Sequence, residues 1–275
     1  MTGAVRVPGP RGDVTVGAEA LVVIAGPCML ESRDLALRTA EAAAAACSRL
    51  GLGYIFKSSY LKANRTASGS PVGPGLEAGL RVLAEVRSAV GAPVLTDVHS
   101  PEEARAAAAV ADVLQVPAFL CRQTALLTAC GATGRVVNIK KGQFLDPAAM
   151  ARAAEKALSA GATGVLLTER GTFFGYGDLV VDFRSLAVMR ESGCPVVFDV
   201  THSLQRPAGP VTGGERRHAP ALARAAVAAG TDALFLETHP DPGRALSDAA
   251  TQWPLDRFEE LVEGCARVRA AVGRG

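Results

Sequence analysis

The chain has 275 residues, of which 49% are hydrophobic and 5% aromatic, and its formal net charge is +2 with interspersed signs. This composition indicates a globular protein with a well-buried core, and the absence of a basic stripe argues against nucleic acid as a partner. The apolar runs are shorter than the roughly 20 residues that a membrane-spanning helix needs, so we expect no membrane association.

The six cysteines form no CxxC pair, and no secretory signal precedes them. Thiols in such a pattern are typical of proteins that keep their cysteines reduced. We therefore expect a cytoplasmic protein without disulfides.

In chain order, the first element is predicted at Val5–Thr15, where Gly9 and Pro10 punctuate a short segment and suggest a hairpin. It lies in an N-terminal extension of residues 1–20. Eight apolar runs rich in Val, Ile and Leu follow, and such unalternating runs are typical of parallel strands that are buried on both faces. The runs are Leu21–Ala25, Gly53–Phe56, Pro93–Thr96, Asp112–Val116, Val136–Ile139, Thr163–Thr168, Pro195–Val200 and Asp232–Leu236.

Helical patterns separate these runs. Ser32 is suited to cap the first helix, and Pro101 and Pro147 are suited to first helical turns. The predicted helices are Ala36–Arg49, Leu76–Val90, Pro101–Val110, Thr124–Ala129, Pro147–Ala160, Arg184–Ser192, Ala219–Ala229 and Leu255–Val272. This alternation, over a length near the roughly 250 residues of that fold, predicts an α/β protein: a single (β/α)8 TIM barrel over residues 1–275, with the hairpin closing its bottom.

Two long loops rich in glycine and proline follow strand ends, at Ala63–Gly75 and at Arg206–Glu215. Loops at the carboxyl ends of barrel strands can gate a substrate, but they can equally be ordinary surface connections. The sequence leaves both interpretations open.

Cations gather at or near the predicted strand ends. A single Lys or Arg is most often a solvated surface charge, whereas a set that converges on one barrel face indicates anionic substrates such as phosphates or carboxylates. Lys57 and Lys140 are the most informative, because each directly follows a buried strand. The set is Lys57, Lys62, Arg65, Arg122, Lys140, Lys141 and Arg170.

A second group could bind a metal. Cys28, His202, Glu237 and Asp248 offer one thiolate, one imidazole and two carboxylates, which suit a divalent ion such as zinc or ferrous iron. Their spacing is too wide to be a motif. Cys28 also fits a small buried residue, and Asp248 also fits a helix cap, so only a shared barrel face favours the metal.

A series of motifs occurs in order along the chain. Among them are Ile24-Ala-Gly-Pro-Cys28, Phe56-Lys-Ser-Ser59, Lys62-Ala-Asn-Arg65, Thr96-Asp-Val-His99, Leu167-Thr-Glu-Arg-Gly171 and Glu237-Thr-His-Pro240. From about Val22 to Leu255 the chain thereby resembles the 3-deoxy-D-manno-octulosonate 8-phosphate synthases. The resemblance implies a (β/α)8 barrel, a homotetramer, and a transferase that condenses phosphoenolpyruvate with D-arabinose 5-phosphate, releases phosphate and serves lipopolysaccharide biosynthesis.

The resemblance also implies roles for individual residues. Lys57, Lys62, Gln115, Lys140 and Arg170 would bind phosphoenolpyruvate, and Arg122 would reach the site of a neighbouring subunit. Asn64, Arg65 and Thr66 would bind the aldose phosphate. The catalytic set would be Lys57, Lys62, Asp97 and His202, with Asp97 positioning a sugar hydroxyl, relaying a proton or pairing with a pocket lysine.

Within this family, Cys28 is typical of the metal-dependent branch, because the other branch has Asn there. The resemblance thus implies one divalent ion, zinc, iron or manganese, bound by Cys28, His202, Glu237 and Asp248.

The chain departs from the family in one loop, residues 66–75. Gly69 and Val72 stand where the family has His and Arg, and Leu61 replaces an Asp. The elements for the metal and for phosphoenolpyruvate are retained, whereas the side that faces the aldose is altered. Two alternatives therefore stay open: the same condensation with a different aldose phosphate, and a catalytically silent barrel.

Overall fold

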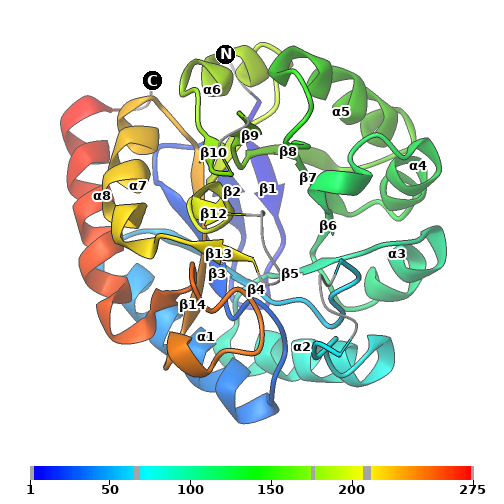
Figure 1. The fold of residues 1–275 in the computed structure, drawn as a ribbon. Helices are drawn as coiled ribbons and strands as arrows, with labels where there is room; N and C mark the ends of the chain where they lie inside the picture. The colour runs from blue at the N-terminus through cyan, green and yellow to red at the C-terminus, as the bar shows by residue number, and fades with distance from the viewer. Residues whose placement is uncertain (1–2, 65–68, 175–176, 207–211, 274–275) are drawn as a thin grey trace.

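The computed structural model describes residues 3–64, 69–174, 177–206 and 212–273. Eight parallel strands form a ring, and eight helices surround it (Figure 1). The ring is closed because the eighth barrel strand pairs with the first as well as with the seventh. In chain order the barrel strands are β3 (Val22–Gly26), β4 (Gly53–Lys57), β5 (Val94–Asp97), β6 (Val113–Val116), β7 (Val136–Lys140), β8 (Gly164–Glu169), β11 (Val196–Asp199) and β14 (Ala233–His239). The predicted TIM barrel is confirmed.

The helices follow the predicted order, with differences at their ends. They are α1 (Arg33–Arg49), α2 (Leu76–Val90), α3 (Pro101–Ala107), α4 (Thr124–Ala132), α5 (Met150–Ser159), α6 (Arg184–Arg190), α7 (Ala219–Ala228) and α8 (Phe258–Val272). Ser32 Oγ accepts a hydrogen bond from Leu35 N at 3.2 Å, so it caps α1 as predicted. The predicted starts of α5 and α8 were three residues too early, because Pro147–Ala149 and Leu255–Arg257 form 3₁₀ turns.

The core has an outer and an inner layer. Small residues of α1, such as Ala36, Ala40 and Ala43, are fully buried against the outward faces of the strands. Inside the ring, Ile24, Ile55 and other strand residues form a separate apolar cluster. Because both strand faces are covered, the strands are mostly apolar, and their polar residues lie mainly toward the carboxyl ends.

The N-terminal hairpin closes the bottom of the barrel. β1 (Val5–Val7) and β2 (Val14–Val16) pair antiparallel, and Val5, Val7 and Val16 join the inner apolar cluster. Gly164 begins β8, and a Cβ on it would lie 2.6 Å from a methyl carbon of Val5. The hairpin therefore fits tightly against the amino ends of the strands, as the sequence predicted.

Short strands lie at the opposite end, the mouth. β9 (Thr172–Phe173) pairs with β10 (Leu179–Val180), β12 (Gln205–Arg206) pairs with β13 (Gly213–Gly214), and β15 (Trp253–Pro254) extends β14. The two loops singled out from the sequence lie only partly within the described residues. None of the described helices is long and apolar enough to span a bilayer.

Candidate active site at the barrel mouth

The carboxyl ends of the strands bring charged side chains together inside the ring. Lys57 ends β4, Asp97 ends β5, Lys140 ends β7, Asp199 ends β11, and Glu237 lies near the end of β14. All five side chains are buried. A buried charge is tolerated only with a partner, so their pairing defines the site.

Lys57 is held by three oxygen atoms. Its Nζ lies 2.6 Å from Glu237 Oε1, donates to the carbonyl oxygen of Cys28 at 3.2 Å, and is 3.8 Å from Asp97 Oδ2. Burial alone raises the pKa of the Glu237 carboxyl, but the charges of Lys57 and His202 bring it below its ordinary value. The pair is therefore ionic, and Lys57 points into the mouth from a fixed position.

Lys140 and His202 share the carboxylate of Asp199. Lys140 Nζ donates to Asp199 Oδ2 at 2.6 Å, and His202 Nδ1 lies 2.8 Å from the same oxygen. Burial lowers the pKa of Lys140, whereas the pKa of Asp199, which burial alone would raise, is lowered by His202 and Lys140. The Phe235 ring lies 3.7 Å below Lys140 Nζ, a cation–π contact that adds to the stabilisation of this charge.

Asp97 anchors a network that crosses the sheet. It accepts hydrogen bonds from Ser59 Oγ and, at 2.6 Å, from Gln115 Nε2, and Lys62 Nζ donates to Ser59 Oγ at 3.0 Å. Burial alone raises the pKa of Asp97, but Lys57 and Lys62 lower it well below its ordinary range. Asp97 is therefore an ionised acceptor, and Gln115 is engaged with it and with Asn138, whose Nδ2 donates to Gln115 Oε1 at 2.8 Å.

Arg170 offers a free donor. Its Nη2 donates to Gln205 Oε1 at 2.6 Å, while Nη1 is buried without a hydrogen-bond partner among the described residues. Burial lowers the pKa of this guanidinium. Beside it, the buried Lys141 ammonium lies 3.6 Å from Glu169 Oε1 and donates to Thr172 Oγ1 at 3.1 Å, which holds the loop that carries Arg170.

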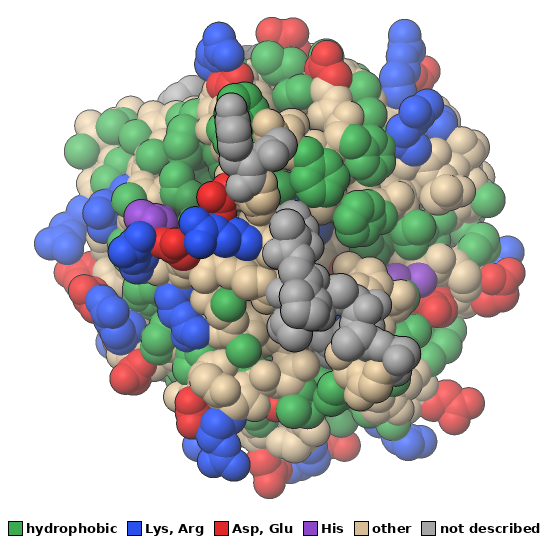
Figure 2. Space-filling view, in the orientation of Figure 1, with side chains coloured by type: hydrophobic (Ala, Val, Ile, Leu, Met, Phe, Trp, Pro, Cys, Tyr) green, Lys and Arg blue, Asp and Glu red, His purple; other side chains and the backbone are tan. Residues whose placement is uncertain are grey.

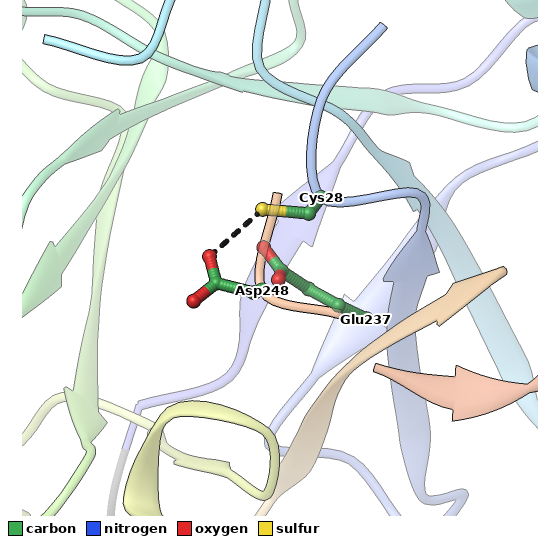
Figure 3. Close-up of side chains that lie close together, drawn as sticks. All are labelled: Cys28, Glu237 and Asp248. Carbon is green, nitrogen blue, oxygen red and sulfur yellow. Dashed lines mark hydrogen bonds between the residues drawn. The ribbon is translucent and has the colours of Figure 1, made fainter. Parts of the chain in front are cut away.

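Three of the four predicted metal ligands converge. The ligand atoms of Cys28, Glu237 and Asp248 lie within 4.8 Å of one another, and the side chains point toward one another in Figure 3. Cys28 Sγ donates to Asp248 Oδ2 at 3.1 Å. The fourth, His202, borders this group: its Nε2 lies 3.7 Å from Glu237 Oε1.

The donor set fits a divalent ion. Glu237 Oε2 is buried and lacks a hydrogen-bond partner within the described part of the chain, so the lone pairs of this oxygen are available to bind an ion. His202 directs Nδ1 to Asp199, which leaves Nε2 toward Glu237, and metal-binding histidines commonly have such a carboxylate behind them. Burial and the neighbouring Glu237 raise the pKa of the Cys28 thiol, and a bound cation would favour its thiolate. A thiolate, an imidazole and two carboxylates are suitable ligands for zinc, iron or manganese.

Asp248 has an unusual backbone conformation. Its φ is +48°, and it is the one non-glycine residue with positive φ in the described ranges. Its side chain accepts from Gln205 Nε2 at 2.6 Å, and its carbonyl oxygen accepts from Thr251 N and Gln252 N at 3.0 Å each. Asp248 is thus not a helix cap, and its strained conformation is typical of functional sites.

Only one of the three predicted aldose residues lies within the described ranges. Asn64 is exposed at the mouth, and Arg65 and Thr66 lie outside the described residues. Arg122 is also exposed, two residues beyond the turn Ala118–Leu120. Asn64 and Arg122 do not join the buried cluster.

Several site residues were missed at the sequence level. Asp199, Gln205 and Gln252 contact predicted ligands, and Asn138 joins the network below Asp97. Asp199 could have been found, because a carboxylate stands three residues before His202 at a strand end. Gln205 and Gln252 carried no such signal, since their neighbours come from distant segments.

The chain was also compared with known proteins. Residues 5–271 match the family model described as "DAHP synthetase I family". A protein of Acidithiobacillus ferrooxidans is 57% identical over 242 residues, which is 87% of this chain and 86% of the relative. A protein of Nitratidesulfovibrio vulgaris is 57% identical over 243 residues, 88% of this chain and 89% of the relative.

A third relative, from Syntrophotalea carbinolica, is 53% identical over 263 residues, 94% of this chain and 95% of its own length. All three relatives bear the name 2-dehydro-3-deoxyphosphooctonate aldolase. The similarity covers every barrel strand in which the mouth residues lie.

Proposed function

The chain belongs to the DAHP synthetase I family, and from this premise we propose that it condenses phosphoenolpyruvate with D-arabinose 5-phosphate. The products are 3-deoxy-D-manno-octulosonate 8-phosphate and inorganic phosphate. The observation that carries the proposal is the set of buried cations at the mouth, Lys57, Lys140 and Arg170, next to the donor cluster around Glu237. A catalytically silent barrel would have no reason to keep buried charges that are costly to desolvate.

The chemistry needs positive charge at two places. Carbon 3 of phosphoenolpyruvate forms a bond to the aldehyde carbon, and water adds to carbon 2, from which phosphate leaves. Negative charge develops on the aldehyde oxygen and on the departing phosphate. Fixed cations in a site shielded from water stabilise such charges without reorganisation.

We assign the phosphate and carboxylate of phosphoenolpyruvate to Lys57, Lys62, Lys140 and Arg170. Arg170 Nη1 supports this assignment, because a buried guanidinium nitrogen without a protein partner suits an anionic oxygen. Gln115 would act through the network that orients Asp97. Asn64, Arg65 and Thr66 remain the proposed contacts of the aldose phosphate.

For Asp97, the geometry disfavours one of the three roles left open by the sequence, the relay of a proton. Its carboxylate accepts from Ser59 and Gln115, and its lowered pKa keeps it ionised near neutral pH. An ionised group of this kind positions Lys57, or a sugar hydroxyl, better than it relays a proton.

We propose that Cys28, His202, Glu237 and Asp248 hold one divalent ion, zinc, iron or manganese, and that the enzyme is metal-dependent. A bound ion would supply a Lewis-acid charge beside the lysines. Asp199 would orient His202, and Lys57 would balance the charge of Glu237.

We further propose a homotetramer. Phe119, Phe144, Phe173 and Phe174 are each between 47% and 65% exposed. They lie on neighbouring segments of the mouth. Phe173 N donates to Gln143 O at 2.9 Å, next to Phe144 in the chain. Gly142 lies close to both the ring of Phe144 and the carbonyl oxygen of Ala118, which precedes Phe119. Figure 2 shows hydrophobic side chains gathered over the region of β7 and β8. Such an exposed patch is typical of an interface, here with a second copy of the chain, and Arg122 would reach the active site of that copy.

We place the reaction in the cytoplasm and the product in lipopolysaccharide biosynthesis. All six cysteines are free and buried, which is in keeping with a reducing compartment.

The proposal is tested with purified protein, phosphoenolpyruvate and a panel of aldose phosphates, with release of inorganic phosphate as the readout. We expect D-arabinose 5-phosphate to be the best acceptor. A clear preference for another aldose phosphate would support the altered-acceptor alternative, and turnover with none of them would support a silent barrel.

A further inference from the structure

One buried side-chain amide joins the proposed metal ligand Cys28 to Ser247, the residue before the proposed ligand Asp248. Gln252 Oε1 accepts a hydrogen bond from the backbone N of Cys28 at 3.2 Å, and Gln252 Nε2 donates to the carbonyl oxygen of Ser247 at 2.8 Å. The side chain has no exposed surface. A neutral amide offers a donor and an acceptor on one rigid group, so it can bridge an N–H on one segment and a carbonyl on another.

On one side of this bridge lies the turn of Asp248. The backbone N of Gln252 donates to Asp248 O at 3.0 Å, so Gln252 binds the turn through both its main chain and its side chain. Asp248 has φ +48°, a conformation that persists only where its surroundings over-determine it. The two bonds of Gln252 are among the contacts that enforce it.

On the other side lies the segment that follows β3. The carbonyl oxygen of Cys28 accepts from Lys57 Nζ at 3.2 Å, and its N–H is taken by Gln252. The backbone of Cys28 is thus fixed at both of its polar groups, which leaves its Sγ aimed at Asp248 Oδ2.

Gln252 is also anchored to the strand that carries Glu237. The next residue, Trp253, begins β15, and its backbone pairs with that of Thr238 in β14, a pairing that does not depend on the Thr238 side chain. Gln252 is therefore linked to three ligand-bearing segments, two through its own atoms and the third through the backbone pairing of Trp253.

We propose that Gln252 is a positioning residue of the metal centre, which fixes the distance between Cys28 and Asp248 before any ion binds. It touches no substrate. We call the two side-chain hydrogen bonds of Gln252 the tether. The inference rests on the proposed function only in that a metal binds at this site, because the tether itself is formed by the chain alone. Partners behind metal ligands typically change metal affinity by 10–100-fold when they are removed.

The tether is tested first on metal-free protein by amide hydrogen exchange. Gln252→Met keeps the length of the side chain and removes both bonds. Thr238→Val is the matched control, because it removes the buried hydrogen bond from Thr238 Oγ1 to Trp253 O, at 2.9 Å, but keeps the backbone pairing of β15 and the bonds of Gln252 to Cys28 and Ser247. We expect faster exchange at Cys28 and around Asp248 in Gln252→Met and no change there in Thr238→Val.

A second variant distinguishes the loss of a single hydrogen bond from misfolding. Gln252→Glu keeps an acceptor for the Cys28 N–H and loses the donor to Ser247 O. We expect it to retain protection at Cys28 and to lose it in the turn. Unchanged exchange at Cys28 in Gln252→Met, or equal loss in Thr238→Val, would overturn the tether.

The consequence for the metal is measured by titration with Co²⁺, whose thiolate charge-transfer band reports the bond to Cys28. We expect Gln252→Met to bind Co²⁺ about 10–100-fold more weakly than the wild type and Thr238→Val. Equal affinities would overturn the positioning role. If the wild type itself gives no thiolate band, the proposed metal centre is wrong, and the exchange data alone then decide the tether.

Discussion

At the scale of single residues, the site depends on buried charges whose partners are fixed in advance. Lys57, Lys140 and Arg170 are each buried, and each has one strong protein contact, at 2.6 Å in every case. Arg170 Nη1 is buried without a hydrogen-bond partner among the described residues, and this is the atom that we propose binds phosphoenolpyruvate.

Arg170→Lys should raise the KM for phosphoenolpyruvate. A lysine cannot reproduce the planar fork, so it loses one of two charged hydrogen bonds, each worth about 1.5–3 kcal/mol, or roughly 10–100-fold in affinity. Initial-rate kinetics will measure it. Arg184→Lys, at an exposed pair with Asp182, serves as control and should leave the KM unchanged; equal KM values for Arg170→Lys and the wild type would contradict the assignment.

Cys28→Ala should lower the content of tightly bound divalent metal by more than about tenfold, since a direct ligand exceeds the effect of an outer partner. Metal content is measured by mass spectrometry after purification and dialysis. Cys194→Ala removes another buried thiol and should keep the wild-type content. Full metal retention in Cys28→Ala would exclude Cys28 as a ligand.

At the scale of elements, the strand runs were predictable because a barrel strand that is covered on both faces needs an unbroken apolar run. Helix ends were less predictable: the 3₁₀ turn Pro147–Ala149 starts with the proline that was predicted to begin a helix. The cations at strand ends were also predictable, because Lys57 and Lys140 each directly follow such an apolar run. Gln252 was not, because its partners Cys28 and Ser247 come together only when the ring closes.

Val7→Ala tests the hairpin that closes the barrel bottom. Val7 is fully buried in the inner cluster, so removing two methyl groups should lower the free energy of unfolding by about 1–3 kcal/mol. Denaturant unfolding measures this. Because the hairpin lies at the end opposite to the mouth, kcat and KM should stay at their wild-type values; a changed KM would show that the hairpin reaches the site.

Glu103 of α3 links the loops after β4 and β5, and this link should depend on pH. Its Oε2 accepts from Tyr60 Oη at 2.8 Å and from His99 N at 2.9 Å. Burial alone raises the pKa of Glu103, but the hydrogen bonds from Tyr60 and His99 lower it below its ordinary value of 4.5. The stabilisation is therefore fully present above about pH 4.5 and is lost as the pH falls through the lowered pKa.

Glu103→Gln should thus cost about 1–2 kcal/mol of unfolding free energy at pH 7, and the difference from the wild type should shrink below pH 4.5. Chemical unfolding at a series of pH values gives the curve. Glu102→Gln, on the exposed face of the same helix, should show a smaller effect at pH 7. A pH-independent difference for Glu103→Gln would contradict this account.

At the scale of the whole molecule, the exposed aromatic patch predicts assembly. The charged variant Phe144→Asp, Phe174→Asp should dissociate the proposed tetramer, because a carboxylate at an apolar interface must be desolvated. Light scattering coupled to size exclusion measures the mass. Leu158→Asp, at an exposed apolar residue of α5, should remain a tetramer; a wild-type protein that elutes at its chain mass of 28.3 kDa would contradict the proposal.

The central claim is that this barrel mouth joins phosphoenolpyruvate to D-arabinose 5-phosphate. The most direct measurement is mass spectrometry of the product formed from phosphoenolpyruvate and an equimolar mixture of aldose phosphates in which only D-arabinose 5-phosphate carries ¹³C. The account predicts one dominant product, an eight-carbon 3-deoxy acid phosphate that contains the full ¹³C label. An unlabelled product, or one of another chain length, would contradict it.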